Sequence, residues 1–254
     1  MIKDLELNDG DLKFTLELTT PACPFNVEIE DDVRKVIAEL SDLKNFDLNV
    51  TAKVMEGRSL EADTQMATVK NIIGVASGKG GVGKSTVSLN LALALSQTGA
   101  KVGLLDADIY GPSIPLMLGM KDGSMEVEDN KLQPADCNGL KVVSFGFFAD
   151  QSNQAAIYRG PIISGILKQF LVDTNWSELD YLIVDLPPGT GDIPLTLAQT
   201  IPITGILVIT TPQDVASNVA VKAVSMFEKL NVPIIGVIEN MSHFICPNCD
   251  DKHY

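Results

Sequence analysis

The sequence predicts an α/β protein with a doubly wound, mostly parallel sheet, preceded by a small α+β domain. From residue 69 onward, short apolar runs rich in β-branched residues alternate with helical patterns. This alternation is typical of a parallel sheet whose two faces are both covered by helices. Before residue 59 the spacing of apolar residues is different and predicts two strands, a helix and a third strand.

Residues 1–58 are predicted to form the small domain. Residues 11–19 alternate apolar and polar side chains as a half-buried strand does, and the turn residues 8–10 join this strand to a partner strand that contains Leu5 and Leu7. A helix is expected over 28–40, where apolar residues recur on one face. Alternation returns over 46–54 and predicts the third strand.

Residues 59–68 are polar and are predicted to link the small domain to a larger one over 69–254. A chain of 254 residues is long enough for both domains. The strands expected in the larger domain are 72–76, 102–105, 141–145, 181–184, 206–210 and 234–238. The expected helices are 85–98, 161–172, 192–200 and 213–230, and a hairpin is expected within 125–132.

The charge balance limits the classes of partner. Nineteen basic and thirty-three acidic residues give a formal net charge of −14, and no basic cluster interrupts this acidity. Such a charge repels nucleic acid and anionic lipid, so neither is expected as a partner. The apolar runs are too short to cross a bilayer, and the first residues lack the apolar core of a signal peptide. A cytoplasmic protein is therefore expected.

A phosphate-binding loop is predicted between the strand at 72–76 and the helix at 85–98. The stretch Gly78-Lys79-Gly80-Gly81-Val82-Gly83-Lys84-Ser85 matches the pattern G-x-x-x-x-G-K-[ST]. Its glycines let backbone N–H groups point at phosphates, Lys84 would reach the β- and γ-phosphates, and the Ser85 hydroxyl would ligate Mg²⁺. With Thr86 added, these residues form the predicted binding site for ATP, and the fold expected is that of a P-loop NTPase.

Carboxylates follow two of the predicted strands. Asp106 and Asp108 follow the strand at 102–105, and Asp185 ends the strand at 181–184. Ligands bind at the carboxyl ends of strands in open α/β sheets, so these side chains are expected beside the phosphate loop. An apolar strand that ends in Asp is the Walker B pattern, and it predicts that Asp185 holds Mg²⁺ through water.

Cys246 and Cys249 form a C-x-x-C pair, while Cys23 and Cys137 are isolated. Disulfides are improbable in a cytosolic chain, so the pair is expected to bind metal or to be redox-active. Two thiolates are half of the four ligands that a [4Fe–4S] cluster usually has, and a dimer would supply all four. A structural zinc site within one chain is the alternative, with His243 and His253 as further ligands.

Over residues 70–249 the chain closely resembles the Mrp or ApbC family of iron–sulfur carrier ATPases. This family belongs to the deviant Walker A superfamily, with MinD, ParA and the nitrogenase iron protein. The motifs that carry the resemblance are Ser77 to Thr86, Asp106-Ala107-Asp108-Ile109-Tyr110-Gly111-Pro112-Ser113, Arg159-Gly160-Pro161, Asp185-Leu186-Pro187-Pro188-Gly189-Thr190-Gly191-Asp192 and Asn240-Met241-Ser242 followed by the cysteine pair.

The resemblance implies a homodimer with two ATP molecules at its interface. Lys79 would reach across to the partner's nucleotide, and together with Lys84 and Asp108 it forms the expected catalytic set. Asp108 would position the attacking water, while Asp106 would join Ser85 and Asp185 around Mg²⁺. Asn240 is expected to contact the adenine base.

The resemblance further implies that Cys246 and Cys249 of two subunits bridge a [4Fe–4S] cluster that passes to recipient apoproteins. The first residues resemble the small iron–sulfur-assembly domain often fused ahead of this ATPase, most clearly at Thr19-Thr20-Pro21-Ala22-Cys23-Pro24. Cys23 is expected either to handle the cluster or to be a small buried side chain, and Cys137 has no expected role. The family usually has a helix ahead of the first hairpin and continues beyond the cysteine pair, so a shortened chain is expected.

Two other functions within the superfamily have different sequence requirements. A positioning ATPase like MinD or ParA would need a basic amphipathic helix or a basic face, and the sequence has neither. An electron donor like the nitrogenase iron protein would use well-separated single cysteines rather than a C-x-x-C pair.

Overall fold

The computed structural model describes residues 2–40, 43–55, 68–120, 125–129, 131–147 and 160–253. They fall into two compact units, residues 1–56 with 97–100 and residues 57–96 with 101–254. The predicted linker 59–68 lies outside the described residues except for Thr68, so its boundaries stay predictions. No helix within the described ranges is long and apolar enough to cross a membrane.

The first unit is a three-stranded sheet with one helix. Its elements are β1 (Ile2–Asn8), β2 (Asp11–Leu18), α1 (Asn26–Ala38) and β3 (Asn45–Ala52). The strand order is β1-β2-β3, where β1 and β2 pair antiparallel and β2 and β3 pair parallel. Asp9 and Gly10 have φ values of 49° and 92°, which suit the tight two-residue turn of a twisted hairpin. The predicted order of two strands, helix and strand is confirmed.

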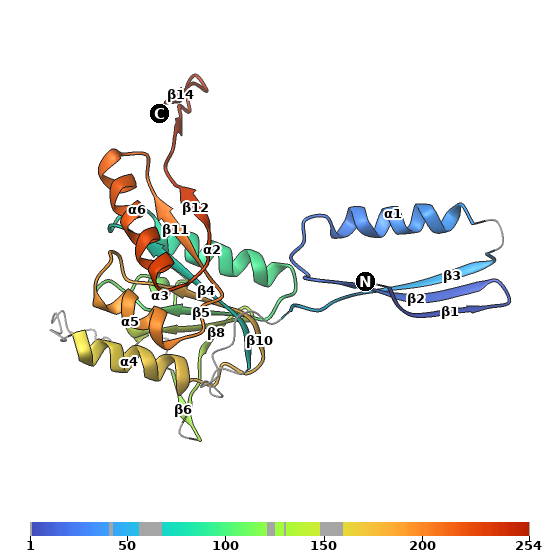
Figure 1. The fold of residues 1–254 in the computed structure, drawn as a ribbon, viewed down its shortest axis with the longest axis horizontal. Helices are drawn as coiled ribbons and strands as arrows, with labels where there is room; N and C mark the ends of the chain where they lie inside the picture. The colour runs from blue at the N-terminus through green and yellow to red at the C-terminus, as the bar shows by residue number, and fades with distance from the viewer. Residues whose placement is uncertain are drawn as a thin grey trace. The chain divides into compact units, whose positions relative to one another are not determined.

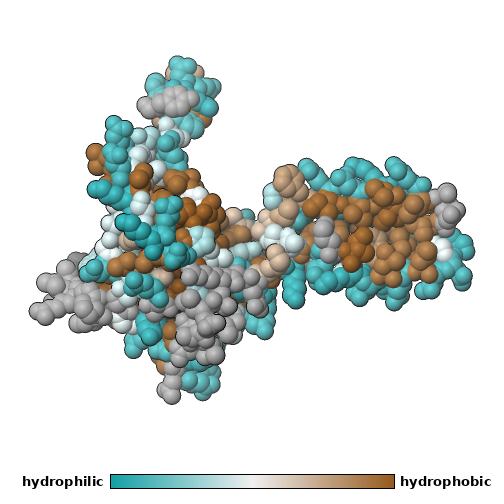
Figure 2. All heavy atoms as spheres, in the orientation of Figure 1, coloured by the Kyte–Doolittle hydropathy of each residue, from teal (hydrophilic) through white to brown (hydrophobic). Residues whose placement is uncertain are grey.

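The core of the first unit is small and lies between α1 and β2. It contains Phe14, Leu16, Leu18 and Ile37, all under 10% exposed. The edge strand β1 has no buried residue, and its apolar side chains Ile2, Leu5 and Leu7 are about 60% exposed. Figure 2 shows the hydrophobic residues of this unit gathered between hydrophilic borders.

The second unit contains a seven-stranded sheet in the order β12-β11-β4-β10-β5-β9-β8. All neighbouring strands are parallel except β8 and β9, so the predicted fold class is confirmed. The strands are β4 (Val69–Ser77), β5 (Val102–Asp106), β8 (Ala135–Cys137), β9 (Leu140–Ser144), β10 (Leu179–Asp185), β11 (Gly205–Thr210) and β12 (Ile234–Glu239).

Helices cover both faces of this sheet, and in Figure 1 its central strands lie between α2 and the pair α4 and α5. The helices are α2 (Lys84–Gln97), α3 (Ile114–Met117), α4 (Gly160–Val172), α5 (Asp192–Thr200) and α6 (Asp214–Lys229). Fully buried side chains of α4 and α6, such as Leu167 and Phe227, share one core cluster with Leu182 and Val208 of the sheet. Burial of this kind contributes about 1.5–3 kcal/mol for each large side chain.

Several short elements complete the second unit. The predicted hairpin within 125–132 forms from β6 (Val127–Glu128) and β7 (Lys131–Leu132), and a 3₁₀ turn, η2 (Phe145–Phe147), follows β9. A further hairpin, β13 (Phe244–Ile245) and β14 (Lys252–His253), encloses the cysteine pair. Strand β8, helix α3 and this last hairpin were absent from the sequence prediction.

Candidate functional site

Three neighbouring strands end at the same level and place their last polar side chains in a row. In the register of the sheet, Asp185 of β10 lies opposite Asp106 of β5, which lies opposite Ser144 of β9. All three residues are fully buried. Because the strands are parallel, their carboxyl ends form one edge of the sheet, the position where ligands bind in open α/β folds.

The phosphate loop joins the end of β4 to the start of α2. Gly81 and Gly83 have φ values of 81° and 86°, a conformation that side chains other than glycine rarely adopt. Gly78 is required for a different reason. A Cβ atom on Gly78 would lie 2.6 Å from the carbonyl carbon of Val219 and 2.7 Å from the nitrogen of Ala220, both in the backbone of α6. The loop therefore packs directly on α6.

Lys84, Ser85 and Asp185 meet at the end of this loop. Lys84 Nζ lies 2.8 Å from Asp185 Oδ1, and the Ser85 hydroxyl donates to Asp185 Oδ2 at 2.6 Å. Lys84 is 6% exposed and Asp185 is fully buried. Hydroxyl and carboxylate oxygens are the ligands that Mg²⁺ prefers, so the donor set fits the expected ion. When bound, Mg²⁺ would neutralise phosphate charge here.

Two buried serines that the sequence prediction missed hold the carboxylates in place. The Ser88 hydroxyl of α2 lies 2.6 Å from Asp185 Oδ1, and the Ser144 hydroxyl donates to Asp106 Oδ2 at 2.9 Å. Both serines are fully buried. Ser144 in turn accepts a hydrogen bond from the N–H of Gly146 at 3.0 Å. Ser88 lies one helical turn after Lys84, a spacing that could have drawn attention to it.

Asp106 is held by backbone as well as by Ser144. Its Oδ1 accepts from the N–H of Asp108 at 3.2 Å, and its Oδ2 accepts from the N–H of Ile114 at 3.3 Å. Burial, with the nearby Asp185 carboxylate, raises the pKa of Asp106 to about 7. Burial also raises the pKa of Asp108, against the opposing effect of Lys84. The Asp108 carboxylate accepts from the N–H of Gly111 at 3.3 Å.

The other predicted loop residues surround this cluster. Lys79 is half-buried, and its carbonyl oxygen accepts a hydrogen bond from the Ser77 hydroxyl at 3.0 Å. Val82 is 1% exposed, whereas Gly80, Gly81 and Thr86 are exposed.

Asn240 also lies on the phosphate loop. Its Nδ2 donates to the carbonyl oxygen of Val82 at 2.8 Å, and its backbone N–H donates to the carbonyl of Thr210 at 2.8 Å. The residue thus joins the end of β12 to the loop. Its predicted contact with adenine stays a prediction.

The cysteine pair lies between β13 and β14, apart from the carboxylates in sequence. The N–H of Cys246 donates to the carbonyl of Asp251 at 2.9 Å, and the N–H of Asp250 donates back to the carbonyl of Cys246 at 2.9 Å. Cys246 is half-buried and Cys249 is exposed, and both are free thiols. The N–H groups of Asn248 and Cys249, with the Cys249 side chain, lower the pKa of Cys246. A thiolate is the form that binds metal.

The described residues do not assemble the alternative zinc site. No three of their His, Cys, Asp and Glu side chains gather closely enough to hold a metal ion. The His253 ring instead lies 6.4 Å, centroid to centroid, from the Phe244 ring. The His243 ring forms a hydrogen bond with the Ser242 hydroxyl. One chain thus offers a metal two thiols and no third ligand within the described part of the chain.

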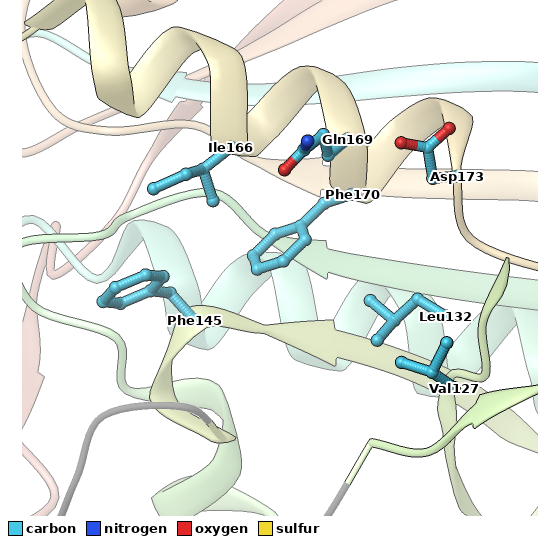
Figure 3. Close-up of a pocket in the computed structure, with 7 residues that line it drawn as sticks. All are labelled: Val127, Leu132, Phe145, Ile166, Gln169, Phe170 and Asp173. Atoms are coloured by element: carbon cyan, nitrogen blue, oxygen red, sulfur yellow. The ribbon is translucent and has the colours of Figure 1, made fainter. Parts of the chain in front are cut away.

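An apolar pocket of about 360 Å³ opens between α4 and the β6–β7 hairpin (Figure 3). Its mostly apolar lining carries polar groups only at Gln169 and Asp173. No predicted site residue lines it, but Phe145 does, and Phe145 lies between Ser144 and Gly146. The complete lining is Val127, Leu132, Phe145, Ile166, Gln169, Phe170 and Asp173.

Comparison with known proteins identifies the family of both regions. Residues 68–254 match the family model described as NUBPL iron-transfer P-loop NTPase, and residues 1–46 match that of an iron–sulfur cluster assembly protein. The chain is 47% identical over 258 residues to an iron–sulfur cluster carrier protein of Synechocystis, covering all of this chain and 73% of the relative. It is 46% identical over 260 residues to the chloroplastic Fe-S cluster assembly factor HCF101 of Arabidopsis thaliana, of which it covers 47%.

A solved structure agrees with these matches. A nucleotide-binding protein from Archaeoglobus fulgidus in complex with ADP superposes with a TM-score of 0.65 at 42% identity, covering 75% of this chain and 74% of that one. Its fold, the family models and the two relatives all agree with the motifs found in the sequence. The chain belongs to the iron–sulfur cluster carrier family of P-loop NTPases, in the ParA superfamily, with an iron–sulfur-assembly region at its N-terminus.

Proposed function

We propose that this protein binds Mg-ATP, hydrolyses it slowly, and carries a [4Fe–4S] cluster between two copies of the chain for delivery to apoproteins. The observation that carries the nucleotide half is the convergence of Lys84, Ser85 and Asp185 on one buried point at the end of the phosphate loop. Family membership and the ADP complex of the Archaeoglobus relative support it.

In this proposal the side chains of the site have different tasks. Lys84 turns from Asp185 to the β- and γ-phosphates, and the Ser85 hydroxyl turns to Mg²⁺. Asp106 and Asp185 orient the water molecules around the ion. Asp108 accepts a hydrogen bond from the attacking water, and Lys79 reaches the nucleotide of the second copy. Asn240 contacts the base.

The cluster half rests on the two thiols between β13 and β14. Cys246 and Cys249 lie at the surface, where a second copy can approach, and two pairs supply the four thiolates of a [4Fe–4S] cluster. The named relatives are an iron–sulfur cluster carrier protein and an Fe-S cluster assembly factor, which favours a cluster over zinc and over the role of a positioning ATPase. The cluster is cargo, and apoproteins are its recipients.

Anaerobic reconstitution tests the cargo. We expect about four irons for each pair of wild-type chains and no bound iron after Cys246→Ala or Cys249→Ala. Cys137→Ala is the matched control, because Cys137 is a half-buried free thiol in β8, and it should keep the iron. One zinc per chain, or no metal at all, would refute cluster carriage.

Hydrolysis is tested separately. Lys84→Ala should abolish ATP turnover. Lys101→Ala removes an exposed lysine whose ammonium lies 3.7 Å from Glu178, and it should leave turnover intact. Unchanged turnover in Lys84→Ala would contradict the catalytic assignment.

A further inference from the structure

Asn240 lies between the phosphate loop and the cysteine pair in the sequence, and it forms hydrogen bonds with both the loop and the sheet. Asn240 directly follows β12, where its N–H donates to the carbonyl of Thr210 at the end of β11. Its side-chain amide donates to the carbonyl of Val82 in the phosphate loop at 2.8 Å. The strand end and the loop are therefore tied together through a single side chain.

The contact with the loop is close. A Cβ atom on Gly83 would overlap the Asn240 amide nitrogen, and the terminal methyl of Met241 would lie 3.8 Å from it. Gly83 has a φ of 86°. Asn240 thus packs on the stretch of backbone that wraps around phosphate in a loop of this type.

The same residue begins the path to the cysteines. Met241 has a φ of 55°, an uncommon conformation for a residue other than glycine, so the chain turns sharply there. Strand β13 starts at Phe244, and Cys246 lies only six residues after Asn240. A displacement of Asn240 would therefore be transmitted to the thiols through a short segment of chain.

We propose that Asn240 couples occupancy of the phosphate loop to the exposure of Cys246 and Cys249. The inference rests on the proposed nucleotide binding and on the cysteines as cargo ligands. The carbonyl of Val82 and the N–H of Gly83 belong to one planar peptide unit. When phosphate draws this N–H toward itself, the carbonyl on the opposite side turns with it. The hydrogen bond from Asn240 must then follow or break, and the chain leading to Cys246 moves.

Alkylation of the cluster-free, reduced protein tests this coupling. Iodoacetamide labelling of each cysteine is followed by mass spectrometry, without nucleotide and with saturating Mg-ADP. The diphosphate is used so that ATP-driven pairing does not itself cover the thiols. We expect ADP to change the labelling rates of Cys246 and Cys249 at least threefold, while Cys23 and Cys137, also free thiols, serve as internal references with unchanged rates.

Two variants separate coupling from a general effect. Asn240→Asp keeps the size of the side chain but cannot donate to the Val82 carbonyl, so the ADP effect should disappear at an ADP concentration that saturates this variant. Ser242→Ala removes a neighbouring hydroxyl that bonds only to His243 among the described contacts, and it should keep the full ADP effect.

The outcomes are distinct. Equal labelling rates of Cys246 and Cys249 with and without ADP in the wild type would overturn the coupling. The full ADP effect in the Asn240→Asp variant would overturn it as well. Loss of all ADP binding in Asn240→Asp also overturns it, because Asn240 would then act in binding alone. A direct ADP titration of the wild type identifies failure of the proposed function, since in that case no nucleotide binds at all.

Discussion

Ser144 shows how a residue without a motif can shape the site. Its hydroxyl lies beside Asp106 because β9 pairs in parallel register with β5, and it is fully buried there. A hydrogen bond to a charged group contributes about 1.5–3 kcal/mol. Fixing the carboxylate in one orientation would therefore be a substantial part of forming the proposed magnesium site.

The Ser144→Ala variant should weaken the contribution of Mg²⁺ to ATP affinity by about tenfold, as expected for loss of about 1.4 kcal/mol. Affinity for ATP without Mg²⁺ should change little, because no phosphate contact is removed. Titration with a fluorescent ATP analogue, with and without Mg²⁺, measures both. Ser217→Ala is the control, since Ser217 lies in α6 and its hydroxyl donates to the carbonyl of Thr211. Equal losses with and without Mg²⁺ would point to a general structural defect.

Asp106 gives the magnesium-free protein a specific pH dependence. Its folded-state pKa of about 7 lies above the ordinary value of 3.8, because burial and Asp185 disfavour its charge. The folded state therefore holds this proton more tightly than the unfolded state does. The resulting stability is fully present below pH 4 and is lost as pH rises through 7.

Compared with Asp106→Asn, the wild type should lose at most about 4 kcal/mol of unfolding free energy between pH 4 and pH 7.5. Urea unfolding in the presence of a chelator measures this difference at each pH. Parallel curves for the two proteins would mean that folding does not raise the pKa of Asp106.

At the scale of elements, the phosphate loop depends on its contact with α6. Gly78→Ala would place a methyl group against the backbone of Val219 and Ala220, which cannot move aside as a flexible side chain can. We expect a loss of about 1–3 kcal/mol in unfolding free energy, the usual range for overpacking. Urea unfolding measures it.

Gly80→Ala is the matched control for this prediction. A Cβ atom on Gly80 meets nothing within 4 Å, and its φ lies outside the left-handed region. Its stability should stay within about 0.5 kcal/mol of the wild type. Equal losses in both variants would show that glycine flexibility, rather than contact with α6, sets the requirement at Gly78.

Elements with a clear period could be predicted from the sequence, and very short ones could not. The helix expected at 85–98 corresponds to α2 (Lys84–Gln97), and the strand expected at 181–184 lies within β10 (Leu179–Asp185). Helix α3 has four residues and β8 has three, too few to display any period. Their positions are set by tertiary contacts.

The same distinction holds within the site. Lys84, Ser85 and Asp185 have fixed places in local motifs, and the structure brings them together as expected. Ser88 contacts Asp185, 97 residues away in the sequence, and this contact depends on how α2 packs on the sheet. Ser144 contacts Asp106, 38 residues away, and this contact depends on strand register. The spacing of Ser88 one helical turn after Lys84 is the one local cue to these contacts, and no local pattern specifies the contact of Ser144.

At the scale of the whole molecule, charge should govern how copies associate. Each chain carries a formal net charge of −14, so two copies repel one another at long range. Raising ionic strength from about 0.01 to 0.15 M shortens the screening length from about 30 to 8 Å. The dissociation constant of the proposed ATP-bound pair should therefore fall, by about tenfold, over this range.

Sedimentation equilibrium of a hydrolysis-deficient protein with Mg-ATP measures this dependence. The nucleotide must be saturating at each salt concentration, so that changes in ATP affinity do not enter. Pairing that weakens with added salt would contradict the prediction and would indicate an interface dominated by ion pairs.

The contact between Lys84 and Asp185 also bears on which anions the phosphate loop would favour. The lysine already has a carboxylate as its internal counter-ion, so free sulfate or orthophosphate must displace that carboxylate and leave it buried without a cation. A polyphosphate chelated to a divalent ion would avoid this penalty, because Asp185 would keep a cation beside it while Lys84 would be free to bind phosphate. Discrimination against simple anions is thus an expected consequence of the ion pair between Lys84 and Asp185.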